Sequence, residues 1–202
     1  MLPQSVRIKF EKKNALKFIS HLDVCRTMKA ALLRASIPVW YTEGFNPHPK
    51  MVFSLPLSIG TESECEFMDI KITAPMPYEE IKERLCAALT PDMGVLEVYA
   101  PQMKFSDIGW ASYQITAKKP LDLSPLLADE VFITKQTKKG EVTLDVKNRI
   151  KNLTQKDNLI EMLLSADSEN FLNPDHLMKL VGQDDYRTVR KNVFSKDMTA
   201  FR

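Results

Sequence analysis

The chain has 202 residues, of which 44% are hydrophobic and 27% charged, and these proportions exclude a disordered chain because they suffice to bury a core. At this length one domain or two small ones are possible, and two of roughly 100 residues are favoured. No apolar run approaches the roughly 20 residues of a bilayer-spanning helix, and the first residues, MLPQSVRIKFEKK, lack the apolar core of a secretory signal. We therefore expect a cytoplasmic protein that does not contact a membrane.

The net charge is only +2, but the charged residues are unevenly distributed. Residues 1–60 hold nine Lys or Arg and three Asp or Glu, residues 61–130 hold six and thirteen, and residues 131–202 hold thirteen and ten. A basic N-terminal third beside an acidic middle favours one site for an anionic ligand and a separate contact surface, because the sign of the field selects what approaches. A surface of ordinary solvated charges remains the alternative.

The first half of the chain predicts strands and helices in alternation. Residues 5–11 alternate apolar and polar side chains, which is typical of a strand. Ser20 with Asp23 three residues later resembles a capping box, and it starts a helix that should end before Pro38. One apolar stripe of this helix is expected to pack on a sheet; it comprises Leu22, Cys25, Met28, Leu32 and Ala35. Further strands are predicted at 39–43, 50–55, 66–73 and 94–99, and a second helix at 78–89.

The second half predicts a looser version of the same order. Strands are expected at 112–118, 131–136, 141–146, 158–166 and near 187–194, with helices at 121–130 and 174–181. Asn173 caps the last helix and Pro174 occupies its first position. The boundary lies between Ala100 and Gly109, which gives an N-terminal domain at 1–104 and a smaller C-terminal domain at 105–202. The predicted fold is α+β, with tandem ferredoxin-like (βαββαβ) units and antiparallel sheets.

The segment EGFNPHPK, residues 43–50, predicts a stiff loop. Gly44 can adopt a positive φ, and Pro47 and Pro49 restrict the residues before them to extended backbone. Such a loop binds a partner at a lower entropic cost because little freedom remains to be lost. The loop would present a stacking ring, a titratable imidazole and a cation, which belong to Phe45, His48 and Lys50. Asn46, next to Phe45, is a further candidate binding residue. The structural alternative is a strand connection with Phe45 in the core and prolines that protect a sheet edge.

The segment KFISHLDVCR, residues 17–26, predicts a second group at the start of the first helix. At about 100° per residue, His21 lies near the centre of the apolar stripe and faces the sheet, while Asp23 points elsewhere. A histidine there is usually a hydrogen-bonded core residue; alternatively, His21 meets an anion held by the free N–H groups of the helix start. Lys17 and Arg26 add positive charge nearby. That His21 and His48 share a cleft is a conjecture.

No metal or cofactor is predicted. The three cysteines are too widely spaced to form a metal site or a disulfide framework; they are Cys25, Cys65 and Cys86. The carboxylates of Glu62, Glu64 and Glu66 would share one face of a strand and could bind a divalent cation. A solvated edge that meets a basic partner is favoured, because no second element supplies ligands.

The chain contains no Gly-rich phosphate loop, no HExxH, no nucleophile elbow and no CxxxCxxC. Near the C-terminus, Arg187, Arg190 and Lys191 could extend a polyanion-binding track or could form a plain surface cluster.

The run FISHLDVCRTMKAALLRASIPVWYTEGFNPHPKMVFSLPLSIGTESECEFMDI resembles the radical-SAM-linked domain family, a bacterial family of unknown function. The resemblance covers residues 7–73 strongly and the remainder weakly. It implies a signature at His21, Asp23, Arg26, Gly44, Phe45, Asn46, Pro47, His48, Pro49 and Lys50. Cys25 and residues 27–29 depart from the more hydrophobic and aromatic helix of the family, which affects the details of helix packing.

Members of this family occur fused to, or encoded beside, cobalamin-type radical-SAM proteins, often near genes for a ribonuclease and ribosomal proteins. The resemblance therefore implies an accessory binding module that acts with a radical-SAM protein and presents RNA or another anionic substrate. The ligand would contact Lys17, His21, Arg26, Phe45, Asn46, His48 and Lys50. One alternative is a metal-independent RNA-processing enzyme in which His21 and His48 supply acid/base catalysis, as the architecture of RAMP-type CRISPR RNA endonucleases suggests. Another is a scaffold that binds only protein.

Overall fold

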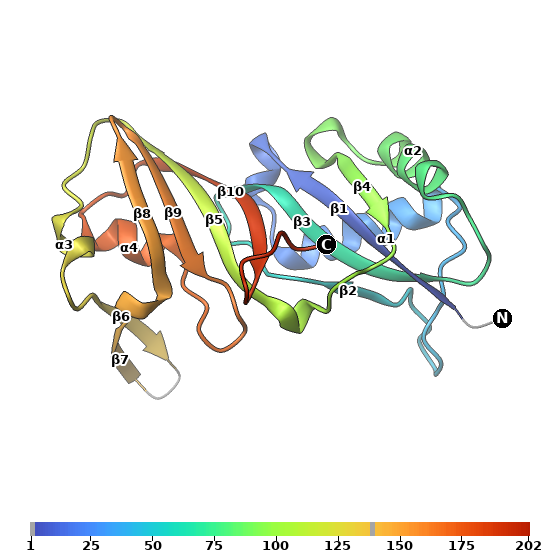
Figure 1. Ribbon diagram of the computed structural model, residues 1–202. Coiled ribbons are helices and arrows are strands. Elements are labelled where there is room, and N and C mark those ends of the chain that lie inside the picture. The colour runs from blue at the N-terminus through green and yellow to red at the C-terminus, as the bar shows by residue number, and fades with distance from the viewer. Residues whose placement is uncertain (1–2, 138–139) are drawn as a thin grey trace. The chain divides into compact units, whose positions relative to one another are not determined.

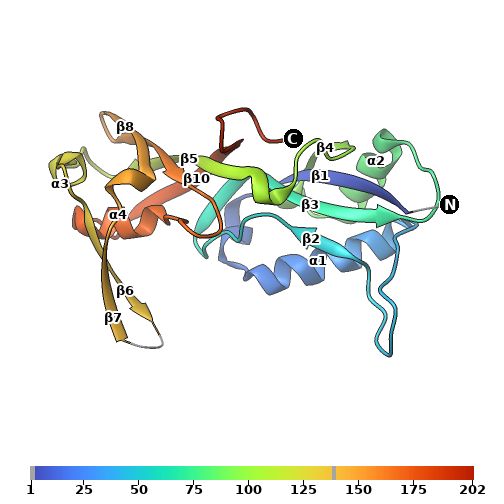
Figure 2. The same ribbon diagram turned by 60° about the horizontal axis from the view of Figure 1, so that its bottom comes forward.

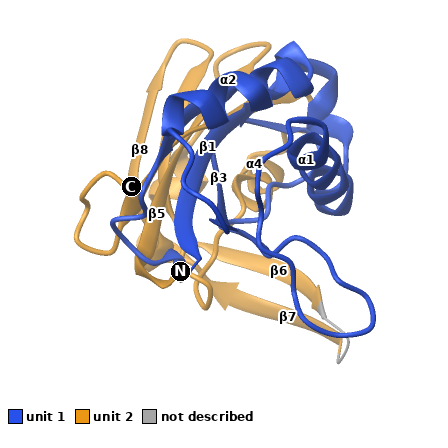
Figure 3. Ribbon diagram, turned by 90° about the vertical axis from the view of Figure 1, so that its right-hand side faces the viewer, with its two compact units in different colours: residues 1–105, 202 blue, residues 106–201 orange. Residues whose placement is uncertain are grey.

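The structure is a computed structural model that describes residues 3–137 and 140–202. The chain is an α+β protein, as predicted, with more strand than helix. It divides into two compact units, of which unit 1 comprises residues 1–105 with 202 and unit 2 comprises residues 106–201 (Figure 3).

Unit 1 is a sheet of four strands with two α-helices (Figure 1). Its elements are β1 (Gln4–Lys12), α1 (His21–Arg34), β2 (Met51–Phe53), β3 (Thr61–Ile72), α2 (Tyr78–Ala88) and β4 (Val95–Tyr99), with short 3₁₀ turns at Asn14–Phe18 and Pro91–Met93. The strand order is β4-β1-β3-β2. β1 pairs antiparallel with both β3 and β4, and β2 pairs antiparallel with β3.

The core of unit 1 lies between this sheet and the helices. Alternate residues of β1 face inward, and Ile8, which is fully buried, pairs in register with the fully buried Met68 of β3. Met28 of α1 and Leu85 of α2 belong to the same buried cluster. Each such side chain stabilises the fold by about 1.5–3 kcal/mol relative to its exposed state. Figure 2 shows α1 running along one face of the strands.

The apolar stripe of α1 differs from the predicted one. The buried residues are Val24, Met28, Ala31 and Leu32, with Ala35 buried just beyond the helix, whereas Leu22 is 57% exposed and Cys25 is half-buried. At about 100° per residue, Leu22 lies at the rim of the face on which Met28 and Leu32 are centred. The predicted stripe was therefore correct in its C-terminal part and wrong at Leu22.

The strand predicted at 39–43 is wrong, because only the isolated bridges Val39–Ile72 and Tyr41–Pro49 form there. Proline lacks the N–H that a continuous ladder requires, so Pro38 and Pro49 interrupt the pairing on both sides. In contrast, β3 begins at Thr61, earlier than predicted, and therefore contains the acidic run.

The described residues of unit 2 form six strands and two α-helices, with a short 3₁₀ turn at Lys147–Arg149. They are β5 (Ile108–Ala117), α3 (Ser124–Leu127), β6 (Phe132–Thr137), β7 (Gly140–Asp145), β8 (Ile150–Lys156), β9 (Leu159–Ser165), α4 (Pro174–Leu180) and β10 (Tyr186–Ser195). Four strands form a sheet of order β10-β5-β9-β8, and β6 with β7 forms a separate hairpin. The strands pair antiparallel in β10–β5, β5–β9, β6–β7 and β8–β9.

Local sequence signals explain most of unit 2. The Asn173 side chain accepts a hydrogen bond from the Asp175 N–H at 3.0 Å, so the predicted cap of α4 is confirmed. Ile115, Ile160 and Leu177 are fully buried on the core side. β8 was not predicted: its register shifts between Ile150 and Asn152, and the extra residue breaks the alternation that identifies a strand.

In the ranges that the structure describes, no helix is both long and apolar enough to span a bilayer.

Candidate functional site

The loop between α1 and β2 is closed at its base by hydrogen bonds around His48. The Thr42 N–H donates to the His48 carbonyl at 2.9 Å, and the His48 N–H donates to Thr42 Oγ1 at 3.2 Å. Beyond this base the chain reverses through Gly44, whose φ of +122° disfavours any other residue. Figure 2 shows the loop projecting away from the strands and helices of unit 1. It is therefore held at its base and presented at its tip.

The His48 ring is part of this base. Its Nδ1 atom lies 3.1 Å from Thr42 Oγ1 and 3.1 Å from the Asn46 carbonyl oxygen. The remaining ring nitrogen, Nε2, is on an exposed side chain and can meet a ligand. Thr42 was missed in the sequence, although a threonine six residues before a loop histidine gives no signal by itself.

Phe45 occupies the tip of the loop and is 111% exposed, so its ring packs on nothing in the chain. The structural alternative, a Phe45 that fills the core, is wrong. An exposed phenyl ring on a braced loop gains free energy only when a partner covers it, because its burial then removes apolar surface from water. Asn46, next to it, is also exposed.

Two lysines meet one indole at the foot of this loop. The Lys50 Nζ lies 5.1 Å from the centroid of the Trp40 ring, and the Lys71 Nζ lies 5.3 Å from it. The backbone fixes this arrangement, since the Trp40 N–H donates to the Lys71 carbonyl at 2.8 Å and the Lys50 N–H donates to the Trp40 carbonyl at 2.9 Å. We call these three residues the Trp40 cluster. Trp40 and Lys71 were missed because they are distant in sequence.

The start of α1 is capped as predicted. The Ser20 side chain accepts from the Asp23 N–H at 3.2 Å and donates to Asp23 Oδ2 at 2.6 Å. The Ser20 hydroxyl and then Arg26 hold the pKa of Asp23 below its ordinary value. Arg26 lies 3.2 Å from Asp23 Oδ1 and is otherwise solvent-exposed. Arg26 therefore completes an ion pair within the first turns of the helix.

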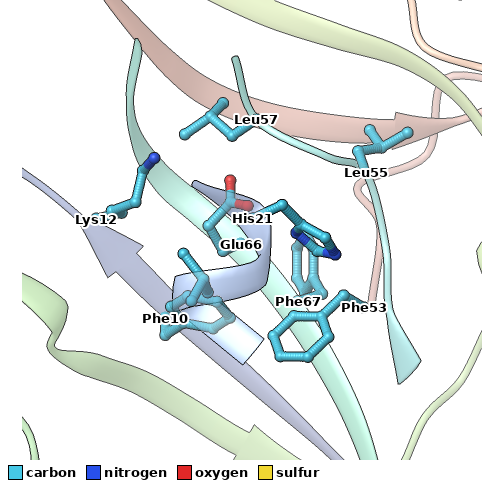
Figure 4. A pocket seen from close by; sticks show the side chains of 9 residues that line it. Phe10, Lys12, His21, Phe53, Leu55, Leu57, Glu66 and Phe67 are labelled. Atoms are coloured by element: carbon cyan, nitrogen blue, oxygen red, sulfur yellow. The ribbon is translucent and has the colours of Figure 1, made fainter. Parts of the chain in front are cut away.

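His21 lies over a narrow pocket rather than in an open cleft. Its ring meets Phe53 edge to face, with centroids 5.4 Å apart. Cys25 Sγ is 3.5 Å from His21 Nε2, and burial raises the pKa of the Cys25 thiol. The pocket encloses about 10 Å³, room for roughly one water. Figure 4 shows Lys12 and Glu66 directed into the same pocket as His21.

Lys12 and Glu66 line this pocket, although the sequence singled out only Glu66, and as part of a solvated edge. Both are buried. Their direction could have been deduced, because Lys12 continues the inward alternation of β1 through Phe10, and Glu66 pairs with Phe10 in register. Neither residue lacks a partner in the structure.

His21 and His48 do not line the same pocket in the described residues. Phe53, whose ring contacts His21, follows His48 by five positions in the chain. In extended backbone this separation amounts to about 16 Å. The conjecture of a shared cleft therefore stays a prediction, to which the pocket at His21 adds no support.

Lys17 is engaged beside the helix start. Its Nζ lies 3.6 Å from Glu62 Oε1 and 5.2 Å from the Phe18 centroid.

Glu62, Glu64 and Glu66 alternate along one face of β3, but Glu62 and Glu66 are buried, so the expected solvated edge is wrong. Among residues 3–137 and 140–202, no three His, Cys, Asp or Glu side chains gather to hold a metal ion.

The C-terminal basic residues do not form a uniform surface cluster. Arg190 is fully buried, Arg187 is exposed and Lys191 is half-buried. The register of β10 shifts between Arg190 and Asn192, so these three residues do not follow one face of a regular strand.

The comparison with protein-family models identifies residues 5–174 as a match to the family described as "Uncharacterized protein conserved in bacteria (DUF2344)". The match spans most of the chain, so the protein belongs to this bacterial family. The comparison with curated proteins finds no match.

Proposed function

We propose that the protein is a binding module that presents single-stranded RNA to a partner enzyme. The observation that carries this proposal is the Trp40 cluster, in which two lysines flank one indole at the foot of a loop with an exposed phenyl ring at its tip. Non-specific binding of single strands combines cations that follow the phosphates with aromatic rings on which bases stack. Both kinds of group are present here within one loop and its base.

The arrangement suits a flexible polyanion better than a compact ligand. The hydrogen bonds of Thr42, Lys50 and Trp40 set the loop before any ligand arrives, which lowers the ordering cost of binding. The Nε2 of His48 is on an exposed side chain, and an imidazole N–H can donate to a phosphate oxygen. Lys17 and Arg26 contribute less in this proposal, because each faces a carboxylate.

The alternative of a metal-independent RNA-processing enzyme has weaker support. A general acid and a general base must both reach one phosphodiester, at hydrogen-bonding distance or through one water. Within the described residues, the pocket that His21 lines does not include His48, so no observed contact brings both imidazoles to one phosphodiester. Binding without hydrolysis is therefore the function we propose.

We further propose that the partner enzyme is a radical-SAM protein and that the chain is a radical-SAM-linked domain. The support is the resemblance of its His-Leu-Asp and Gly-Phe-Asn-Pro-His-Pro-Lys segments to that family. We also propose that each unit is a variant of the ferredoxin-like fold. The strand orders β4-β1-β3-β2 and β10-β5-β9-β8 support this, because both are the order of that fold once the β6–β7 hairpin is treated as an insertion.

The test is the affinity for a labelled single-stranded RNA, measured by fluorescence anisotropy over a series of salt concentrations. Each phosphate contact on a single strand contributes about 0.7 to the slope of log K against log salt. Lys50→Ala should weaken binding and reduce that slope by about 0.7, whereas Lys29→Ala, which removes the same charge from the exposed side of α1, should leave it unchanged. The proposal would be refuted if the affinity for RNA did not depend on the salt concentration, or if Lys50→Ala and Lys29→Ala changed the affinity equally. A complex with the radical-SAM protein that RNA does not alter would instead support a protein-only scaffold.

A further inference from the structure

The sheet of unit 2 carries a second polar surface, on the face opposite its core. Along β5, Ala111, Tyr113 and Ile115 are buried, whereas the alternate residues from Trp110 to Thr116 are partly or fully exposed on the opposite face. In register across four strands, Asn192, Ser112, Leu163 and Asn152 form one row of this outer face. Gln114 and Glu161 pair in the next row. An outer face made of amide, hydroxyl and carboxylate groups can donate and accept hydrogen bonds in close succession.

This face is hollowed. A depression of about 340 Å³ is lined by residues that include Ser112, Gln114, Asn152, Glu161, Asn192 and Phe194, all within unit 2. Depressions that hold small organic ligands have volumes of about 300–1,000 Å³. The hollow is thus large enough for one nucleoside but not for a folded macromolecule.

Two β-bulges explain why a sheet is concave here. The register of β10 shifts between Arg190 and Asn192, which makes Lys191 the extra residue. The register of β8 shifts between Ile150 and Asn152, which makes Lys151 the extra residue. β10 and β8 therefore each bulge at a Lys-Asn pair, and bulges bend a strand and redirect its side chains, often beside functional sites.

One polar atom in the hollow lacks a partner. Ser112 Oγ is buried from solvent, and within the described residues no hydrogen-bond partner reaches it. An unsatisfied buried hydroxyl costs about 1–3 kcal/mol, so rotation of the Ser112 side chain toward the hollow, where a ligand can pair with it, regains free energy. Ser112 lies in the same row as the two asparagines, where such a ligand would contact all three.

Aromatic groups border the polar row. Trp110 and Phe194 pair in register on the same face, one step beyond Ser112 and Asn192. The Lys151 Nζ lies 4.8 Å from the Trp110 centroid. Aromatic rings beside amides, with a lysine at the rim, are the groups that bind an unpaired nucleotide through stacking, edge hydrogen bonds and phosphate contact.

From this juxtaposition we infer that the outer face of unit 2 binds one unpaired nucleobase. The flat base stacks at Phe194 and Trp110, and its edge pairs with the amides of Gln114 and Asn192, because an amide offers a donor and an acceptor side by side, as a base edge does. The Ser112 hydroxyl takes up a further edge atom. This inference deepens the proposed function, since it assigns the RNA ligand a base-binding site apart from the phosphate-binding lysines of unit 1.

The two tryptophans allow a direct test. Trp40→Phe leaves Trp110 as the only indole, beside the hollow, and removes the Trp40 cluster from the measurement. The fluorescence of Trp110 in this background is titrated with adenosine, cytidine, guanosine and uridine, and separately with ribose. We expect saturable quenching by at least one nucleoside and none by ribose.

Matched variants locate the binding. Asn192→Ala and Gln114→Ala should each raise the dissociation constant about tenfold, the loss expected for one paired amide. Thr116→Ala, on the same face of β5 but outside the hollow, should leave it unchanged. Circular dichroism verifies that each variant is folded.

Three results would overturn the inference: no saturable quenching up to about 1 mM nucleoside, equal binding of ribose, or equal affinities of the Asn192→Ala and Thr116→Ala variants. The base site of unit 2 and the RNA-binding surface of unit 1 can fail independently of each other. Salt-dependent RNA binding that requires Lys50, with no nucleoside quenching, removes the base site alone. If nucleosides quench Trp110 but Lys50→Ala does not weaken RNA binding, the proposed RNA-binding surface of unit 1 is refuted and the base site is retained.

Discussion

Replacement of Phe45 by alanine separates function from stability in this protein. The ring is 111% exposed at the loop tip, so its removal opens no cavity and exposes no new apolar surface. The free energy of unfolding should therefore change by less than about 0.5 kcal/mol, as for surface substitutions in general. If a base stacks on this ring, its loss should cost about 1–3 kcal/mol of binding free energy. That range corresponds to a roughly 5- to 150-fold rise in the dissociation constant.

The assay pairs two measurements on the same preparation. Anisotropy of a labelled single-stranded RNA gives the dissociation constant, and urea unfolding followed by circular dichroism gives the stability. Phe132→Ala is the control, because Phe132 is also a large exposed ring, 50% exposed on the β6–β7 hairpin of unit 2. It should leave the affinity for RNA unchanged.

An unchanged affinity after Phe45→Ala would show that the loop tip does not stack on RNA. A fall in stability of more than about 1 kcal/mol would show that the ring packs on the chain in solution, and the structural alternative for the loop would then return. Equal losses of affinity in Phe45→Ala and Phe132→Ala would show that aromatic rings bind RNA without regard to their place.

Three further predictions concern stability. Ser20→Ala should cost about 1 kcal/mol in urea unfolding and should raise the pKa of Asp23, followed by NMR titration, because it removes the hydrogen bonds at the start of α1; an unchanged pKa would contradict the capping argument. Asp69→Ala should cost about 3 kcal/mol, because it leaves the fully buried Arg7 without the carboxylate that it contacts at 2.7 and 2.8 Å; a loss below about 1 kcal/mol, typical of exposed pairs, would contradict it. Burial lowers the pKa of His176 from its ordinary 6.5, so the unfolded chain binds the proton more readily and stability, complete above pH 6.5, should fall as the pH drops through the folded-state pKa. His176→Gln should flatten this dependence in thermal unfolding between pH 7 and 5, and an unaltered slope would show that other groups cause it.

Features that depend on a few neighbouring residues were predictable from the sequence. The caps at Ser20 and Asn173 were found because the side chain and the N–H it binds are two or three residues apart. The strand at 5–11 was found because one face is buried along its length. In each case the chemistry that decides the structure lies within one turn or one alternation.

The Trp40 cluster was beyond reach for the opposite reason. Trp40 and Lys71 meet because Val39 bridges to Ile72, and this register depends on how a whole loop is placed against β3. Prolines explain why the strand expected at 39–43 is absent, but not which residue then lies beside Lys71. The pairing of this loop with β3 brings the cluster together, and no pattern of neighbouring residues predicts that pairing.

The bulges of unit 2 show why a binding surface and a failed strand prediction can coincide. An extra residue at Lys151 removes the period of two from β8 and so hides the strand, yet the same residue bends the sheet and turns Asn152 toward the hollow. Regular alternation of apolar and polar residues is typical of a flat strand that packs one face on a core, and such a flat face has no depression for a ligand. A strand that must curve around a base has to give up the pattern by which strands are recognised. Irregular stretches between recognisable strands, such as the one at Lys151 and Asn152, are therefore where binding residues should first be sought in other members of this family.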